Sequence, residues 1–183
     1  MSEALRASWK PLEIPSDWKP GAECSWSVVE LEGNACGLLQ GLLPDHSAFT
    51  AYLTSDHDRL FLDWKATTGY GTSTFTQLES GPCDASEIRG VITLSDYYTP
   101  TFPESDYQSF RLASPDDKKA LWCYTSRDSE AFVKLSKELE PGSIATDSKG
   151  PKKVTLRLER GPEDSLPNQW MIGGLLHLDW LSP

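Results

Sequence analysis

The chain has 183 residues, of which 38% are hydrophobic and 10% aromatic, and its formal net charge is -10 at pH 7. This length and apolar content suffice for one domain with a sizeable core, and they exclude a chain that is disordered throughout. The negative charge disfavours nucleic acid and anionic membranes as partners, because both present phosphate groups of the same sign.

The cysteines and the N-terminal sequence favour a soluble, cytoplasmic protein. Residues 1–20 contain charged side chains throughout and lack the apolar core of a secretory signal. No apolar stretch of the sequence is long enough to span a membrane. None of the four cysteines belongs to a Cys-x-x-Cys pair, so we expect free thiols in a reducing compartment rather than a disulfide scaffold or a zinc site.

We expect one β-rich domain, residues 21–183, preceded by an irregular arm, residues 1–20. Three prolines in the arm interrupt any helix, because each fixes φ and removes a backbone donor. Trp9 and Trp18 are the side chains expected to pack the arm against the domain.

Four strands are predicted directly after the arm. Val28 and Val29 favour an extended backbone in the first of them. Gly37 and Gly41 predict that the second is bulged or bent. A short polar segment separates the third from the fourth, as in a hairpin. The four strands are expected at residues 24–31, 35–43, 48–54 and 59–65.

Four more strands are predicted in the middle of the chain. The first is a β-prone run of threonine and serine around Phe75, and the second contains Val91 and Ile92. Two prolines and two adjacent tyrosines predict a loop at residues 97–106. The four strands are expected at residues 72–79, 87–96, 107–113 and 119–125.

The last third of the chain predicts one helix and two strands. Asp128 can cap a helix whose apolar residues follow helical spacing until Pro141 stops it. A polar loop is expected at residues 142–152. Alternating apolar and polar side chains then predict an amphipathic strand at residues 154–158, and a long final strand is expected at residues 169–181.

About ten strands and one short helix predict an all-β, mainly antiparallel fold. Short connections favour antiparallel pairing, and so many strands must close into a barrel or divide into two packed layers. The strand at residues 119–125 is apolar on both faces, which favours a closed or partly closed barrel of lipocalin-like outline. The Gly-x-Trp start of lipocalins is not met, since Cys24 stands two residues before Trp26. A β-sandwich remains the alternative.

The last predicted strand holds the candidate catalytic pair. In an extended strand residues i and i+2 lie on the same face, so His177 and Asp179 are expected to be neighbours. A carboxylate beside an imidazole raises its pKa and fixes its orientation, which suits a general base. The structural alternative is a polar pair on the solvent face.

Aromatic side chains in the predicted strands are the candidate ligand-binding residues. On the inside of a barrel they would suit a small, largely apolar molecule, whereas the structural alternative is ordinary core packing. The loop tyrosines Tyr97, Tyr98 and Tyr107 could instead surround a pocket mouth or stack on sugar rings. The candidates are Trp26, Trp64, Tyr70, Trp122, Tyr124 and Met171.

The first functional hypothesis is a barrel that binds a small apolar molecule. If it is an enzyme, a cofactor-independent isomerisation or cyclisation is expected, because a shaped pocket alone can lower the barrier by several kcal/mol. The sequence contains no nucleotide-binding, metal-binding or triad motif, so neither a cofactor nor a metal is expected. The alternative is a cytosolic, lectin-like β-sandwich that binds carbohydrate, and a third hypothesis is an interaction module without a pocket.

Overall fold

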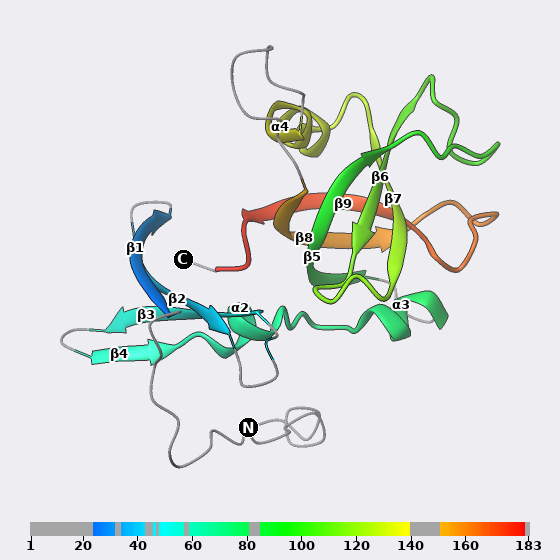
Figure 1. The fold of residues 1–183 in the computed structure, drawn as a ribbon. Helices are drawn as coiled ribbons and strands as arrows, with labels where there is room; N and C mark the ends of the chain where they lie inside the picture. Colours follow the sequence, from blue (N-terminus) through cyan, green and yellow to red (C-terminus); the bar gives the residue numbers. More distant parts are fainter. Residues whose placement is uncertain are drawn as a thin grey trace.

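The computed structural model describes residues 24–31, 34–42, 46, 48–56, 59–80, 85–139 and 151–181. In this part of the chain, nine strands and three short helices form two mainly antiparallel sheets, which confirms the all-β class (Figure 1). The expected arm, Cys83 and most of the expected loop at 142–152 lie outside the described residues. None of the helices in the described ranges is long and apolar enough to cross a membrane.

The first sheet, called the open sheet below, contains the four strands predicted after the arm. Its strands pair antiparallel in the order β1-β2-β3-β4. They are β1 (Ser25–Leu31), β2 (Asn34–Leu42), β3 (Ala48–Asp56) and β4 (Arg59–Leu62).

The second strand, predicted to be bulged or bent, has no bulge, because β2 pairs with both neighbours in an unbroken register. Its glycines have a packing role instead. A Cβ atom at Gly37 would overlap the ring of Trp26, and one at Gly41 would crowd the Cys24 thiol and the Phe49 ring. The glycines therefore let side chains lie flat on the strand.

The fourth strand is shorter than predicted, because helix α2 (Trp64–Thr68) begins where the strand was expected to continue. Asp63 caps this helix by accepting a hydrogen bond from the Ala66 amide at 2.9 Å. Gly69, at φ 65°, ends it in the left-handed conformation that favours glycine.

The strand predicted at residues 72–79 is wrong, since helix α3 (Phe75–Ser80) forms there. A capping box starts the helix: Thr74 N donates to Gln77 Oε1 at 2.8 Å, and Gln77 N donates to Thr74 Oγ1 at 3.3 Å. Phe75 and Leu78, three residues apart, are both buried. Cap and spacing together outweigh the β-propensity of the threonines.

The second sheet, called the ring below, has five strands, each paired with two neighbours in the order β5-β6-β7-β9-β8 and back to β5. Only the pairing of β7 with β9 is parallel among the described pairs. The strands are β5 (Ala85–Ser95), β6 (Tyr107–Ala113), β7 (Ala120–Ser126), β8 (Lys152–Arg160) and β9 (Gln169–Leu178).

The predicted helix is present as α4 (Glu130–Leu139), between β7 and β8 in the chain. Its cap is Ser129 and not the predicted Asp128, because Ser129 Oγ accepts the hydrogen bond from Phe132 N at 3.1 Å. Leu135 and Leu139 join the core of the ring.

Alternate side chains of all the ring strands point inward and form one buried cluster with α3 and α4. Most of these inward side chains are completely buried, so apolar side chains occupy the interior of the ring. Those from the strands are Ile88, Ile92, Phe110, Leu112, Leu121, Cys123, Val154, Leu156, Leu158, Trp170 and Ile172.

The sequence predicts regular alternation of side chains in the last strand, but β9 does not alternate regularly. Its pairing with β8 shifts in register twice, at Thr155/Leu156 and at Arg157/Leu158. Each shift inserts an extra residue on β9 and exchanges its two faces. In a regular strand Leu175 and Ile172 would lie on different faces, but here both pack against the same core.

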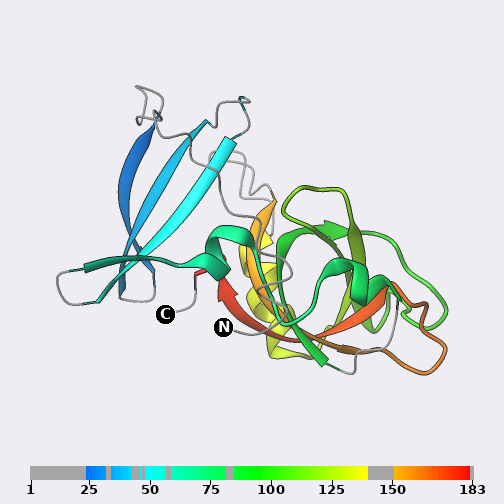
Figure 2. The ribbon, with the colours of Figure 1, turned by 90° about the horizontal axis from the view of Figure 1, so that it is seen from below.

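The C-terminal residues that follow β9 lie between the open sheet and the ring (Figures 1 and 2). Trp180 and Leu181 pack with Cys36 and Tyr52 of the open sheet in a second buried cluster. The Trp180 indole also donates a hydrogen bond to Gly90 O on β5 at 3.0 Å. The end of the chain thus joins the two sheets.

Candidate functional site

A group of aromatic side chains lies on the outer side of the five-stranded sheet that we call the ring. Leu121 and Cys123 of β7 point into the core, so strand alternation places Trp122 and Tyr124 on the outer surface. This corrects the expectation that Trp122 and Tyr124 line an internal pocket.

The loop between β5 and β6, residues 96–106, folds over these two side chains. The Tyr97 ring lies against Trp122 with centroids 4.6 Å apart and ring planes tilted by 31°, and the Phe102 ring stacks on Tyr124 with centroids 4.0 Å apart. Phe102 and Tyr124 are completely buried, whereas Tyr97 remains 36% exposed and Trp122 is half-buried. We call Tyr97, Phe102, Trp122 and Tyr124 the aromatic face. Its accessible part is the Tyr97–Trp122 pair.

Polar and flexible side chains border the aromatic face on the neighbouring strands. Arg111 of β6 lies directly opposite Trp122, and its Nη2 donates to Asp117 Oδ1 at 2.7 Å. Met171 of β9 lies opposite Tyr124 and is half-buried. The border therefore presents a guanidinium, a carboxylate and a thioether beside the exposed rings.

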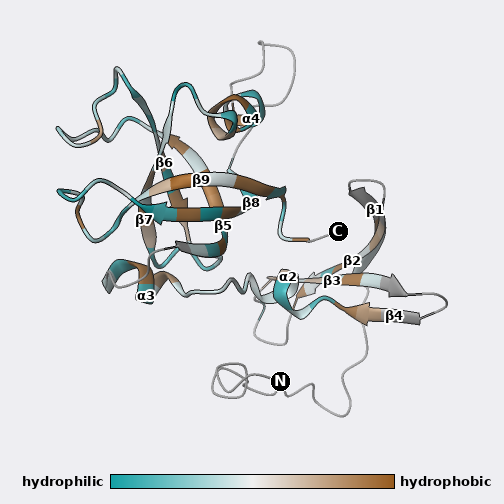
Figure 3. Cartoon of the chain, turned by 180° about the vertical axis from the view of Figure 1, so that it is seen from behind, coloured by the Kyte–Doolittle hydropathy of each residue, from teal (hydrophilic) through white to brown (hydrophobic). Residues whose placement is uncertain are grey.

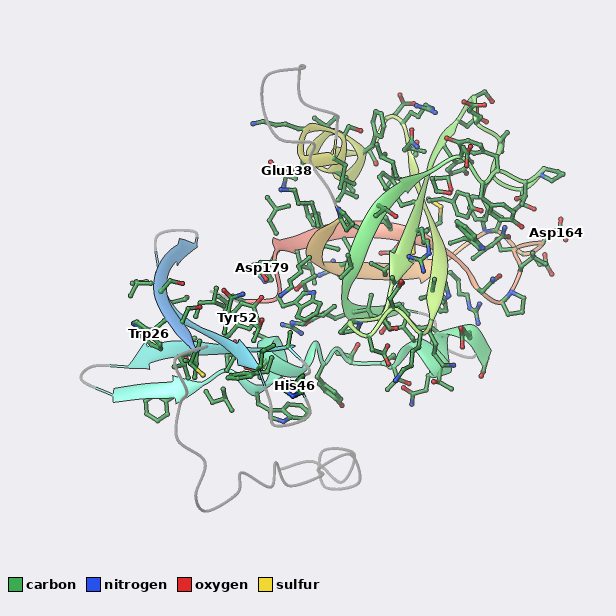
Figure 4. The ribbon with its side chains drawn as sticks, in the orientation of Figure 1. Trp26, His46, Tyr52, Glu138, Asp164 and Asp179 are labelled. Carbon is green, nitrogen blue, oxygen red and sulfur yellow. The ribbon has the colours of Figure 1, made fainter. Side chains whose placement is uncertain are left out.

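A second loop, residues 161–168, meets the first beside the aromatic face. Thr101 Oγ1 donates to Asp164 O at 3.5 Å, and a Cβ atom at Gly161 would crowd the Phe102 ring. Figure 4 shows Asp164 at the end of the ring that is remote from the open sheet. The two loops contain five carboxylates and no lysine or arginine. The carboxylates are Asp96, Glu104, Asp106, Glu163 and Asp164.

The other candidate ligand-binding residues lie elsewhere. Trp26 is on β1 of the open sheet, and Trp64 stacks with Tyr70 beside α2 with centroids 5.1 Å apart. Of the six predicted residues, the structure therefore brings Trp122, Tyr124 and Met171 together on β7 and β9, and separately pairs Trp64 with Tyr70.

The candidate catalytic pair is divided between a strand and the segment after it. His177 lies in β9 opposite Thr155, whereas Asp179 follows the end of the strand with φ 86°. The Asp179 carboxylate accepts a hydrogen bond from the Tyr52 hydroxyl at 2.9 Å (Figure 4). It also accepts one from the Trp180 amide at 2.6 Å.

Lys153 completes a polar cluster with Tyr52 and Asp179 at the junction of the two sheets. Its Nζ donates to the Tyr52 hydroxyl at 2.9 Å and lies 4.6 Å from the centre of the Trp180 ring. Burial, and then the Asp179 charge, raise the pKa of Tyr52 above its ordinary value. Tyr52 is therefore a protonated donor at neutral pH, and its hydrogen bonds with Lys153 and Asp179 join the two sheets. The catalytic role expected for His177 and Asp179 stays a prediction.

Cys24 and Cys123 are free thiols, and Cys36 is a buried cysteine of the open sheet. Burial raises the pKa of both Cys36 and Cys123, which makes them poor nucleophiles and metal ligands. No group of three His, Cys, Asp or Glu side chains within the described ranges is placed to hold a metal ion.

Neither a protein-family model nor a curated protein matches this chain. The geometry of the site is therefore the basis for a proposed function. Sequence reasoning had noted Tyr97 but had missed Phe102 and Arg111. The available signal was the density of aromatic residues and prolines in residues 97–106, which is unusual for a solvated loop.

Proposed function

We propose that this protein binds carbohydrate on the aromatic face, between the loops at residues 96–106 and 161–168. The observation that carries the proposal is the partly exposed Tyr97–Trp122 pair on the outside of β7, with centroids 4.6 Å apart. An aromatic ring offers a flat apolar surface on which the C–H face of a sugar can stack. The Arg111–Asp117 pair beside it supplies donors and acceptors suited to sugar hydroxyl groups.

The arrangement of the ring supports this location. We take the ring to be a small closed barrel, narrower than the eight-stranded lipocalin type because it has five strands. The five-stranded OB-fold binds oligonucleotides and oligosaccharides on its second and third strands and on the loops 1–2 and 4–5. The corresponding parts here are β6, β7 and the loops at 96–106 and 161–168. This likeness is one of architecture, so it supports the place of binding and not the ligand.

Local charge favours a sugar over a nucleic acid. The two loops contain five carboxylates and no basic side chain, whereas proteins that bind single strands use a positively charged groove. Arg111, the guanidinium beside the exposed rings, is already paired with Asp117. A polar ligand without phosphate groups therefore fits the site best.

The interior of the ring offers less support for an apolar ligand. Phe110, Leu121 and Leu156, from three different strands, are completely buried in one continuous cluster. A molecule among them would have to displace close-packed side chains. The expectation of an isomerase or cyclase stays a prediction, since the aromatic face needs only to bind.

The test is a glycan-array screen followed by calorimetry with the full chain. We expect Tyr97→Ala to weaken binding of the best glycan about tenfold, which corresponds to about 1.4 kcal/mol. Tyr70→Ala is the matched control, because Tyr70 also stacks on a tryptophan but lies beside α2. Equal weakening by both variants, or salt-dependent binding of a single-stranded oligonucleotide in preference to any glycan, would contradict the proposal.

A further inference from the structure

The two faces of the open sheet have different surroundings. One face contains Cys36, Leu38 and Tyr52 and packs on Trp180 and the ring. The strand register places a second set of side chains on the opposite face, which we call the outer sheet face. Its members are Cys24, Trp26, Val28, Leu39, Phe49, Ala51, Leu53 and Leu62.

The outer sheet face is apolar and accessible. Trp26, Val28 and Leu62 are 49%, 65% and 53% exposed, and β4 is coloured as hydrophobic in Figure 3. The eight side chains named above are all uncharged. A solvated sheet face normally carries polar residues, and a large apolar patch marks an interaction site.

We propose that the N-terminal segment, residues 1–23, covers the outer sheet face. The segment joins the sheet at Cys24, whose thiol lies on this face beside Gly41 and the Phe49 ring. The segment is therefore attached at the edge of the outer sheet face. Its sequence supplies five large apolar residues for such a contact. They are Leu5, Trp9, Leu12, Ile14 and Trp18.

Length and composition suit this occupant. An extended segment of 23 residues can reach roughly 75 Å. Neighbouring strands of a sheet lie only about 4.8 Å apart, so the segment is long enough to cross all four strands of the open sheet. Three prolines favour an extended course over a helix. The tether also gives the segment a local concentration in the millimolar range without any partner.

A second copy of the chain is the competing occupant. Two copies would each bring a formal charge of -10 to the assembly, which opposes association. The segment itself is nearly neutral, with three basic and four acidic residues among positions 1–23. Charge therefore favours the tethered segment.

The test is limited chymotrypsin digestion of the full chain, with mass spectrometry of cleavage after Trp9 and Trp18. We expect slow cleavage in the original protein and about tenfold faster cleavage in Val28→Asp, because cleavage follows the population of the uncovered state. Val133→Asp is the matched control: Val133 is 62% exposed on α4, close to the 65% of Val28. It should leave the cleavage rate unchanged.

Two outcomes would overturn this proposal. One is rapid cleavage after Trp9 and Trp18 in the original protein that Val28→Asp does not change. The other is a dimer by light scattering that Val28→Asp converts to a monomer without altering cleavage, which would assign the face to a second copy. Neither outcome bears on carbohydrate binding, which concerns the ring.

Discussion

Tyr52 and Asp179 are 127 positions apart in the sequence, yet a hydrogen bond of 2.9 Å joins them. The contact brings the open sheet onto the segment that follows β9. Asp179 can take its positive φ, 86°, because Asp tolerates the left-handed region better than most residues. Its carboxylate then accepts hydrogen bonds from both the Tyr52 hydroxyl and the Trp180 amide.

Buried phenols give a prediction at the residue scale. Burial raises the pKa of Tyr124 to about 12, and burial together with Asp179 raises that of Tyr52. We expect these two tyrosines to ionise well above the ordinary value of about 10 in an ultraviolet titration of the folded protein. Tyr52→Phe should remove one of the late steps.

The same shifts define a pH dependence of stability. Because both pKa values are raised in the folded state, the stability they contribute is fully present below about pH 10 and is lost as the pH rises above it. The measurement is urea unfolding between neutral pH and about pH 11. Simultaneous ionisation of all tyrosines near pH 10 in the folded chain would contradict the assignment.

Short elements in this protein depend on their caps. Helix α3 is only six residues long, and isolated helices of that length are unstable in water. The reciprocal Thr74–Gln77 bonds satisfy donors at its N-terminus, while Phe75 and Leu78 attach it to the core. The cap and the two apolar contacts together make the helix possible.

The capping box gives a prediction at the scale of the element. Thr74→Ala should lower the free energy of unfolding by about 1 kcal/mol, because it removes a side-chain acceptor from the first turn. Thr76→Ala, at an exposed position in the same helix, should change it by less than about 0.5 kcal/mol. Urea denaturation checks both variants, and equal effects would refute the role of the cap.

At the scale of the whole molecule, Arg89 of β5 joins segments that are remote in the chain. Its Nε donates to Trp180 O at 2.9 Å, and its Nη1 donates to Tyr70 O at 2.7 Å. The guanidinium is almost completely buried and pairs with Glu87 at 2.9 Å. It thus connects the ring, the α2–α3 connection and the C-terminal segment.

We expect Arg89→Met to lower the free energy of unfolding by about 3 kcal/mol. The substitution keeps apolar volume but leaves two carbonyls and one carboxylate without their charged donor. Arg157→Met is the control, because Arg157 is exposed on β8. Thermal and urea unfolding would check the pair. A similar small effect of both changes would show that Arg89 does not hold these segments together.

The sequence by itself determined the elements whose signal is local. The positions of β6, β7 and α4, and the alternation of Val154, Leu156 and Leu158 in β8, follow from propensity and from the periods of strand and helix. The threonine-rich run around Phe75 predicts a strand, which is wrong because the capping box and the core contacts of Phe75 and Leu78 stabilise a helix there.

Only the tertiary structure decided which side of each strand faces inward and which residues meet. Trp122 and Tyr124 are apolar enough for either face of β7, and the closure of the ring placed them outside. Register shifts in β9 change which of its side chains point into the core. Asp179 forms a hydrogen bond with Tyr52 of the open sheet. These outcomes depend on contacts between residues far apart in the chain. Local sequence carries no information on such contacts, because they exist only after the sheets have closed and packed.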